Sequence, residues 1–312
     1  MDFLEKILSC NSVAGNTENM RELLKNELSS LFDNVKEDIF GSCIFTKKFG
    51  EGKKLMLCTS IETTGVIVCY ADKSVLSLSP LGNAKWANFA HSKVQLKNVS
   101  GNLIPPSGYS DSTPLTDFSL ETYDEKAYEK VSLGESGFIC ETPEMTTGDI
   151  CHGFGAAIKM CIYSLCKITQ KLSQNDFEAL KELGIGQLCV AFIGQESLLY
   201  RGSSGASYDF DPNFVINLSP YNLEEKNVGS FGLEDGFLIK MLDKGFVASE
   251  EVVAEIEKLS KVFGVKTKRC VSNSERSSLS RLTLGCGEEG CAELCIPAKH
   301  FGTRGEAVKK LL

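Results

Sequence analysis

Apolar residues recur with helical spacing in several parts of the chain. Met20, Leu24 and Leu28 occupy one face of a predicted helix over 17–32, because residues four apart lie above one another on a helix. The stretch 154–172 is apolar on most sides, which predicts a buried helix. Further helices are predicted over 231–242, 250–263 and 305–312.

Short apolar runs between these segments predict strands. The runs at 187–193 and 213–218 are apolar on both faces, as expected for strands covered by helices on two sides. Further strands are predicted over 54–60, 266–271 and 292–296, and on both sides of Gly41 within 35–48. Because strands alternate with helices, we predict an α/β fold with a mixed sheet sandwiched between helical layers.

The pattern changes between residues 66 and 147. Short alternating runs and Gly or Pro turns replace the helical spacing there, and they predict strands over 74–79, 93–97 and 137–141. We therefore predict a small β-barrel-like domain at 66–147, inserted into a discontinuous α/β domain that consists of 1–65 and 148–312.

Composition narrows the classes of function. The 312 residues carry a formal charge of -8, which argues against a nucleic-acid partner and against binding to an anionic membrane. No apolar run is long enough to span a bilayer. The N-terminus has neither the basic region nor the cleavage site of a signal peptide. We expect a cytoplasmic protein.

Thirteen cysteines are many for such a chain. Most lie in apolar runs, where a free thiol packs as a small hydrophobic side chain and a reducing compartment keeps it reduced. A metal cluster of Cys270, Cys286, Cys291 and Cys295 is an alternative, but the sequence contains no Cys-x-x-Cys pair. Core packing is the favoured interpretation for these thiols.

Several short motifs follow one another along the chain. Residues 60–65 are Ser-Ile-Glu-Thr-Thr-Gly, residues 194–197 are Gly-Gln-Glu-Ser, and residues 200–202 are Tyr-Arg-Gly. Asn-Ser-Val-Ala-Gly at 11–15, Ser-Pro-Leu-Gly at 79–82 and Ile-Pro-Ala-Lys at 296–299 complete the series. In order and spacing they resemble the glutamyl and deblocking metallo-aminopeptidases, which form tetrahedral dodecamers and are also named cellulases or endoglucanases.

The resemblance implies a two-metal chemistry. In that family two divalent metals, zinc or cobalt, polarise the peptide carbonyl and lower the pKa of a bridging water. A glutamate acts on this water as general base. Carried over to this chain, the general-base position holds Glu196, and Glu62 stands where the family has an aspartate.

The five metal-ligand positions of the family hold other residues in this chain. They fall on Ser60, Cys151, Ser197, Ser219 and Gly302. Hydroxyls and glycine supply no strong ligand at neutral pH. We therefore expect no bound metal and no peptidase activity, and instead a peptide-binding, assembly or regulatory role. The resemblance also implies a homo-oligomer or association with a related aminopeptidase.

A rebuilt metal site is the main alternative. A shift of two residues keeps side chains on the same face of a strand, so Asp149 and His300 could enter the site. With His152, Glu62 and Glu196, and with Cys151 as an alternative to Asp149, they would form a rearranged site for an active aminopeptidase-type hydrolase that uses Glu196 as general base. A structural subunit without a ligand is a third hypothesis.

Two nucleophile motifs receive less weight. The segment Ser203-Ser204-Gly205 has no His and Asp partners placed for a catalytic triad. Cys151 precedes His152 directly, and adjacent side chains rarely orient towards each other as a thiol–imidazole pair needs.

Overall fold

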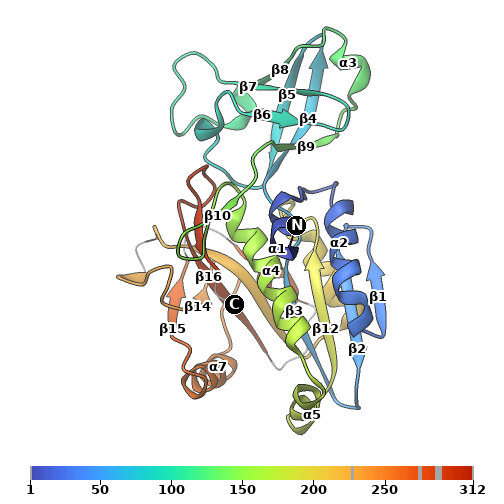
Figure 1. Ribbon diagram of the computed structural model, residues 1–312, viewed down its shortest axis with the longest axis vertical. Helices are drawn as coiled ribbons and strands as arrows, with labels where there is room; N and C mark the ends of the chain where they lie inside the picture. The colour runs from blue at the N-terminus through green and yellow to red at the C-terminus, as the bar shows by residue number, and fades with distance from the viewer. Residues whose placement is uncertain (1, 226–227, 273–275, 285–289, 311–312) are drawn as a thin grey trace.

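A sheet with helices on both faces forms the larger part of the molecule, and a small β-barrel stands at one end of it (Figure 1). The computed structural model describes residues 2–310, except 226–227, 273–275 and 285–289. This architecture confirms the predicted α/β fold with a barrel-like insertion.

Eleven strands make up one mixed sheet. Nine of them run from one edge to the other in the order β1 (Asn34–Glu37), β2 (Cys43–Lys48), β12 (Ile185–Ile193), β3 (Lys53–Ser60), β13 (Phe214–Asn222), β16 (Gly290–Lys299), β17 (Ala307–Lys309), β11 (Ile150–His152) and β10 (Glu144–Thr146). Strand β16 also pairs with β14 (Phe237–Leu242), which pairs with β15 (Thr267–Val271). Strands β12, β3, β13 and β16 are mutually parallel, so their carboxyl ends point to one edge of the sheet.

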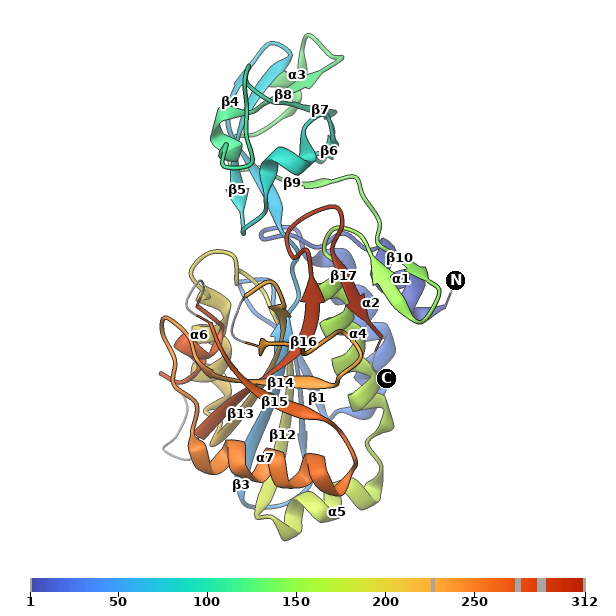
Figure 2. The same cartoon turned by 90° about the vertical axis from the view of Figure 1, so that its left-hand side faces the viewer.

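Helices cover both faces of this sheet (Figure 2). One face carries α1 (Phe3–Ser9), α2 (Glu18–Leu28), α4 (Ala156–Lys171) and α5 (Gln174–Glu182). The opposite face carries α6 (Arg201–Phe210) and α8 (Leu279–Leu282), and α7 (Glu250–Val262) packs against β16.

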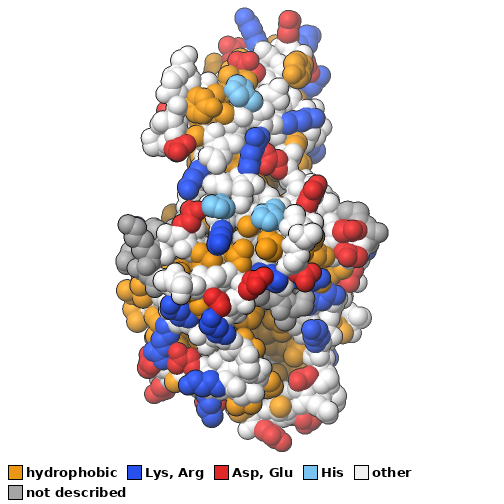
Figure 3. Space-filling model, turned by 60° about the vertical axis from the view of Figure 1, so that its left-hand side comes forward, with side chains coloured by type: hydrophobic (Ala, Val, Ile, Leu, Met, Phe, Trp, Pro, Cys, Tyr) orange, Lys and Arg blue, Asp and Glu red, His pale blue; other side chains and the backbone are white. Residues whose placement is uncertain are grey.

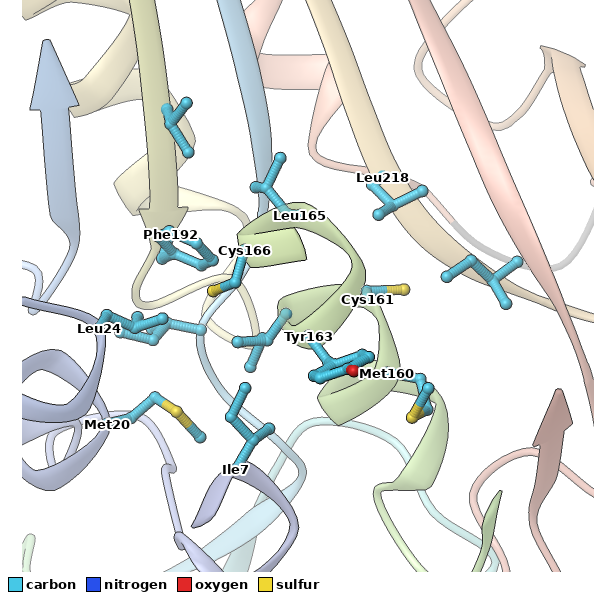
Figure 4. Close-up of a cluster of buried hydrophobic side chains, with 14 of the residues drawn as sticks. Ile7, Met20, Leu24, Met160, Cys161, Tyr163, Leu165, Cys166, Phe192 and Leu218 are labelled. Atoms are coloured by element: carbon cyan, nitrogen blue, oxygen red, sulfur yellow. The ribbon is translucent and has the colours of Figure 1, made fainter. Parts of the chain in front are cut away.

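The main hydrophobic core lies between α4 and the sheet (Figure 4). Met160, Cys161 and Leu165 of α4 belong to the same buried cluster as Phe192 of β12 and Leu218 of β13. Because α1 and α2 also pack against α4, most of this helix is buried. The predicted burial of this segment is confirmed, and its apolar surroundings explain why its hydrophobic residues are not confined to one face.

Six strands close the barrel in the order β4 (Gly65–Asp72), β5 (Val75–Leu81), β8 (Ser119–Thr122), β7 (Ser100–Ile104), β6 (Lys93–Gln95) and β9 (Ser136–Ile139). A short helix, α3 (Ala127–Lys130), packs outside them. The barrel has its own core, which includes Leu76, Leu103 and Phe89. Phe154, just before α4, packs against Phe89 with ring centroids 4.5 Å apart, so the barrel core reaches the larger domain.

Two predicted helices are wrong. Within 231–242 the chain forms strand β14, because Gly236 takes a positive φ of 105° and the following apolar residues pair with β15 and β16. Within 305–312 it forms β17, because Val308 is buried in the core and Ala307 and Val308 pair with both β16 and β11. Residues 311 and 312 lie outside the described part.

Helices α1, α5 and α6 were not predicted from the sequence. They are short or rich in Gly and Ser, which weakens their hydrophobic period.

Within the described residues, no helix has the length and apolar character that a membrane span requires. Most of the described cysteines are buried as expected, although Cys69 and Cys140 are exposed. Cys286 lies outside the described residues.

Candidate functional site

A cleft of about 650 Å³ opens at the carboxyl ends of β3 and β13. The ends of parallel strands are the usual place for a ligand in such sheets. Five residues singled out from the sequence line this cleft, namely Ser60, Glu62, Glu196, Ser197 and Ser219. They come together because Ser60 and Ser219 lie in the last part of β3 and β13 and the others follow β3 and β12, and these parallel strands have their carboxyl ends at the same edge.

The carboxylate of Glu62 holds the turn that follows β12. Its Oε1 accepts the backbone N–H of Gln195, and its Oε2 accepts the Ser197 hydroxyl at 2.7 Å and the Ser197 N–H at 3.4 Å. Burial raises the pKa of Glu62, and these hydrogen bonds offset part of the rise. The Ser60 hydroxyl turns back to the Glu62 backbone, with bonds of 3.1 and 3.2 Å.

Both oxygens of Glu196 also accept hydrogen bonds from the protein. Oε1 accepts the Ser203 hydroxyl at 2.8 Å and the Ser203 N–H at 3.2 Å, and Oε2 accepts the Ser278 hydroxyl. Burial raises the pKa of Glu196 to about 8, against the opposing effect of these donors. Ser203 lies on α6, and its hydroxyl donates to this carboxylate.

A buried ion pair lies on the cleft wall beside Ser219. Lys240 of β14 places Nζ 2.7 Å from Oε1 of Glu293 of β16, and the same oxygen accepts the Ser219 hydroxyl. The strands set this meeting, because Lys240 and Glu293 are direct partners in the ladder between β14 and β16. No described residue donates to Glu293 Oε2, although this atom is buried.

The rim of the cleft is basic. Lys244 and Arg276 line it and are exposed. Between them and the floor lies Ser277, which is buried and whose hydroxyl has no described partner. Over the wider face drawn in Figure 3, acidic and basic side chains are interspersed without a large patch of one sign.

Two of the predicted ligand positions do not line the cleft. Cys151 of β11 is fully buried in the main core, and burial raises the pKa of its thiol to about 12. Gly302 lies in a turn after β16, and its N–H donates to Glu306 at 3.0 Å. Glu306 also accepts the N–H of Ala157 at the start of α4 at 2.7 Å, so this carboxylate joins the turn to the helix.

The residues of the alternative rebuilt site are not gathered. Asp149 and His152 are exposed outside the cleft lining, and His300 pairs with Glu224 at 2.7 Å on the surface. Within the ranges that the structure describes, no three His, Cys, Asp or Glu side chains are grouped as metal ligands. Cys291 and Cys295 belong to different clusters of the core.

Four charged residues of the cleft were not predicted from the sequence: Lys240, Lys244, Arg276 and Glu293. The available signal was a single charge inside each of two apolar runs, at Lys240 and at Glu293. A lone charge within a buried strand needs a partner, and these two residues are partners of each other.

Comparison with known proteins places this geometry in context. No protein-family model matches the chain. It is 24% identical over 308 residues, 96% of this chain and 90% of the relative, to a protein of Acetivibrio thermocellus named "Putative aminopeptidase". The sequence therefore has an aminopeptidase-like relative over nearly its whole length.

Solved structures show the same fold. The aminopeptidase APDkam598 of the archaeon Desulfurococcus kamchatkensis superimposes with a TM-score of 0.85 at 14% identity, over 98% of this chain and 89% of that chain. The TET1 peptidase of Pyrococcus horikoshii, which assembles into a tetrahedron or a large octahedral shell, gives 0.83 at 17% identity, over 98% and 93%. The chain has the fold of the TET aminopeptidases, and the resemblance inferred from its motifs is confirmed.

Proposed function

We propose that this chain is an aminopeptidase-like protein that binds peptides in its cleft without hydrolysing them by metal catalysis. One observation carries the proposal: the protein's own donors occupy both carboxylate oxygens of Glu62 and of Glu196. The two acids that the family resemblance assigns to catalysis therefore hold loops in place.

The donor set of the cleft does not fit a pair of divalent cations. Zinc and cobalt sites need imidazoles, thiolates or carboxylates, whereas Ser60, Ser197 and Ser219 offer hydroxyls. Cys151 is buried in the core with its thiol protonated at neutral pH, and Gly302 has no side chain. The neighbouring carboxylate, Glu293, is already paired with the Lys240 ammonium.

The alternative of an active hydrolase with Glu196 as general base has less support. A general base must be ionised and must reach the proton that it removes. Burial raises the pKa of Glu196 to about 8, which disfavours the ionised form that a general base needs. Both of its oxygens also face serine hydroxyls rather than an open position.

The proposal includes assembly. The TET1 peptidase of Pyrococcus horikoshii forms closed shells, and we extend this to a homo-oligomer of the present chain. Light scattering on a size-exclusion column measures the mass of the assembly directly. A species of one chain only, at micromolar concentration, would contradict this part of the proposal. Association with a related active aminopeptidase is its heteromeric form.

The proposed lack of peptidase activity is tested by comparing the wild-type protein with Glu196→Gln. Both proteins are incubated with a panel of aminoacyl-p-nitroanilides in the presence of zinc or cobalt. We expect no turnover above buffer from either protein. Turnover by wild type that Glu196→Gln loses, while the surface control Glu178→Gln keeps it, would contradict the proposal and favour the hydrolase.

A further inference from the structure

Large hydrophobic side chains gather on the surface around α7. In the described part of the chain eighteen large hydrophobic residues are exposed, and six of them lie between residues 242 and 265. We call these six the α7 patch: Leu242, Val247, Leu259, Val262, Phe263 and Val265. Single exposed hydrophobic residues are normal, whereas a group of them marks an interaction site.

The α7 patch has one part at each end of the helix. Leu242 and Val247 form a β-bridge just before the helix begins. Leu259, Val262 and Phe263 lie at the other end, where they are neighbours because residues three and four apart share a helix face. The patch therefore extends over the length of α7.

The packing of α7 leaves this surface uncovered. The helix lies on the outside of the larger domain and packs against β16 (Figure 2). Val253, near its start, is fully buried, whereas Val262 and Phe263 at its end are 72% and 75% exposed. An amphipathic helix normally turns its apolar residues towards the core, so α7 carries more apolar surface than its own sheet covers.

The charges of α7 are divided between its two ends. Glu251 lies near the start and Lys261 near the end, and both are exposed. The other charged residues of the helix already form ion pairs within the chain, namely Glu250, Glu255, Glu257 and Lys258. Within the described residues, Glu251 and Lys261 form no ion pair, so both remain for a partner.

We infer that the α7 patch is an interface with a second copy of this chain, in which the two α7 helices lie antiparallel across a twofold axis near residue 256. This inference rests on the proposed assembly into a homo-oligomer and adds the surface that joins two copies.

One register of the two helices satisfies both the charges and the apolar ends. Glu251 and Lys261 each lie five residues from position 256, so each copy brings its Glu251 to Lys261 of the other, and the twofold axis repeats the contact. Val247 and Val265 each lie nine residues from the same position, so the apolar segments beyond the helix ends meet as well. The surface is thus complementary to itself in charge and in apolar character.

Light scattering on a size-exclusion column, over a range of concentrations of the full-length protein, tests the interface. We expect Val262→Glu to lower the mass of the assembly to about half of the wild-type value or less, because each lost twofold contact separates two copies. The matched control is Leu183→Glu, because Leu183 lies at the end of α5 and is 72% exposed, as Val262 is. The control should keep the wild-type mass.

Charge reversal tests the antiparallel register. Glu251→Lys and Lys261→Glu each place like charges at both contacts, so each should raise the concentration of half-assembly about tenfold or more. The double variant Glu251→Lys/Lys261→Glu restores opposite charges and should return to within about threefold of the wild-type value. A double variant that assembles no better than the single ones would overturn the antiparallel arrangement.

The outcomes separate this inference from the proposed assembly. If the wild-type protein assembles and Val262→Glu has the same mass as Leu183→Glu, the interface is overturned and the homo-oligomer stands. If the wild-type protein consists of one chain only, the homo-oligomer and the interface are both contradicted, and the heteromeric form of the assembly remains.

Discussion

Replacing Lys240 by methionine should destabilise the protein strongly, because it leaves a carboxylate unpaired inside the fold. Lys240 Nζ lies 2.7 Å from Glu293 Oε1, and the two side chains are 9% and 0% exposed. Burial alone lowers the pKa of Lys240, but the charge and hydrogen bond of Glu293 outweigh it and raise the pKa. The charged form of Lys240 is therefore favoured in the native state.

The size of the effect follows from this burial. Removing one partner of a buried ion pair costs about 3–5 kcal/mol, whereas replacing both with apolar residues is often neutral or stabilising. In Lys240→Met/Glu293→Leu, the Ser219 hydroxyl also loses its acceptor, at a cost of about 1 kcal/mol. We expect the double variant to be clearly more stable than the single one.

Urea unfolding followed by far-ultraviolet circular dichroism measures both values by linear extrapolation. The control is Lys258→Met. The side chains of Lys258 and its partner Glu255 are 71% and 58% exposed, so loss of this ion pair should lower the free energy of unfolding by less than about 1 kcal/mol. The reasoning is refuted if Lys240→Met costs no more than this control, or if the double variant is as unstable as the single one.

Two further predictions concern buried carboxylates. Burial raises the pKa of Glu196 to about 8, so the contribution of its protonated form to stability is complete below the ordinary carboxyl pKa of about 4.5 and is lost as pH rises towards 8. Thermal melting between pH 5 and 9 should therefore show a fall in melting temperature that is smaller in Glu196→Gln. The same fall in wild type and variant would contradict this prediction. Glu306→Ala should destabilise by about 1–2 kcal/mol, because the start of α4 and the Gly302 turn lose their shared acceptor; urea unfolding checks it, and a loss below about 0.5 kcal/mol would contradict the capping role.

Much of the larger domain could be predicted from local patterns. Helix α4 was recognisable because it is buried on most sides, and the parallel strands because they are apolar on both faces. Strand β14 was mistaken for a helix because its conformation depends on pairing with β15 and β16. Such long-range pairing overrides a local hydrophobic period.

The candidate site was predictable to the extent that it follows strand ends. Ser60, Glu196 and Ser219 converge because their strands are parallel neighbours. The pairing of Lys240 with Glu293 depends on the register between β14 and β16, which one sequence does not supply. The basic rim of the cleft was missed for a related reason, because loops far apart in sequence form it.

The metal content of the purified protein tests the central claim most directly. Protein prepared without chelator, then incubated with excess zinc or cobalt and desalted, is analysed by inductively coupled plasma mass spectrometry. We expect far less than one metal ion per chain, and a melting temperature that a chelator does not change. Two tightly held ions per chain, with a chelator lowering the melting temperature, would contradict the claim that serines, a core thiol and a glycine cannot hold them.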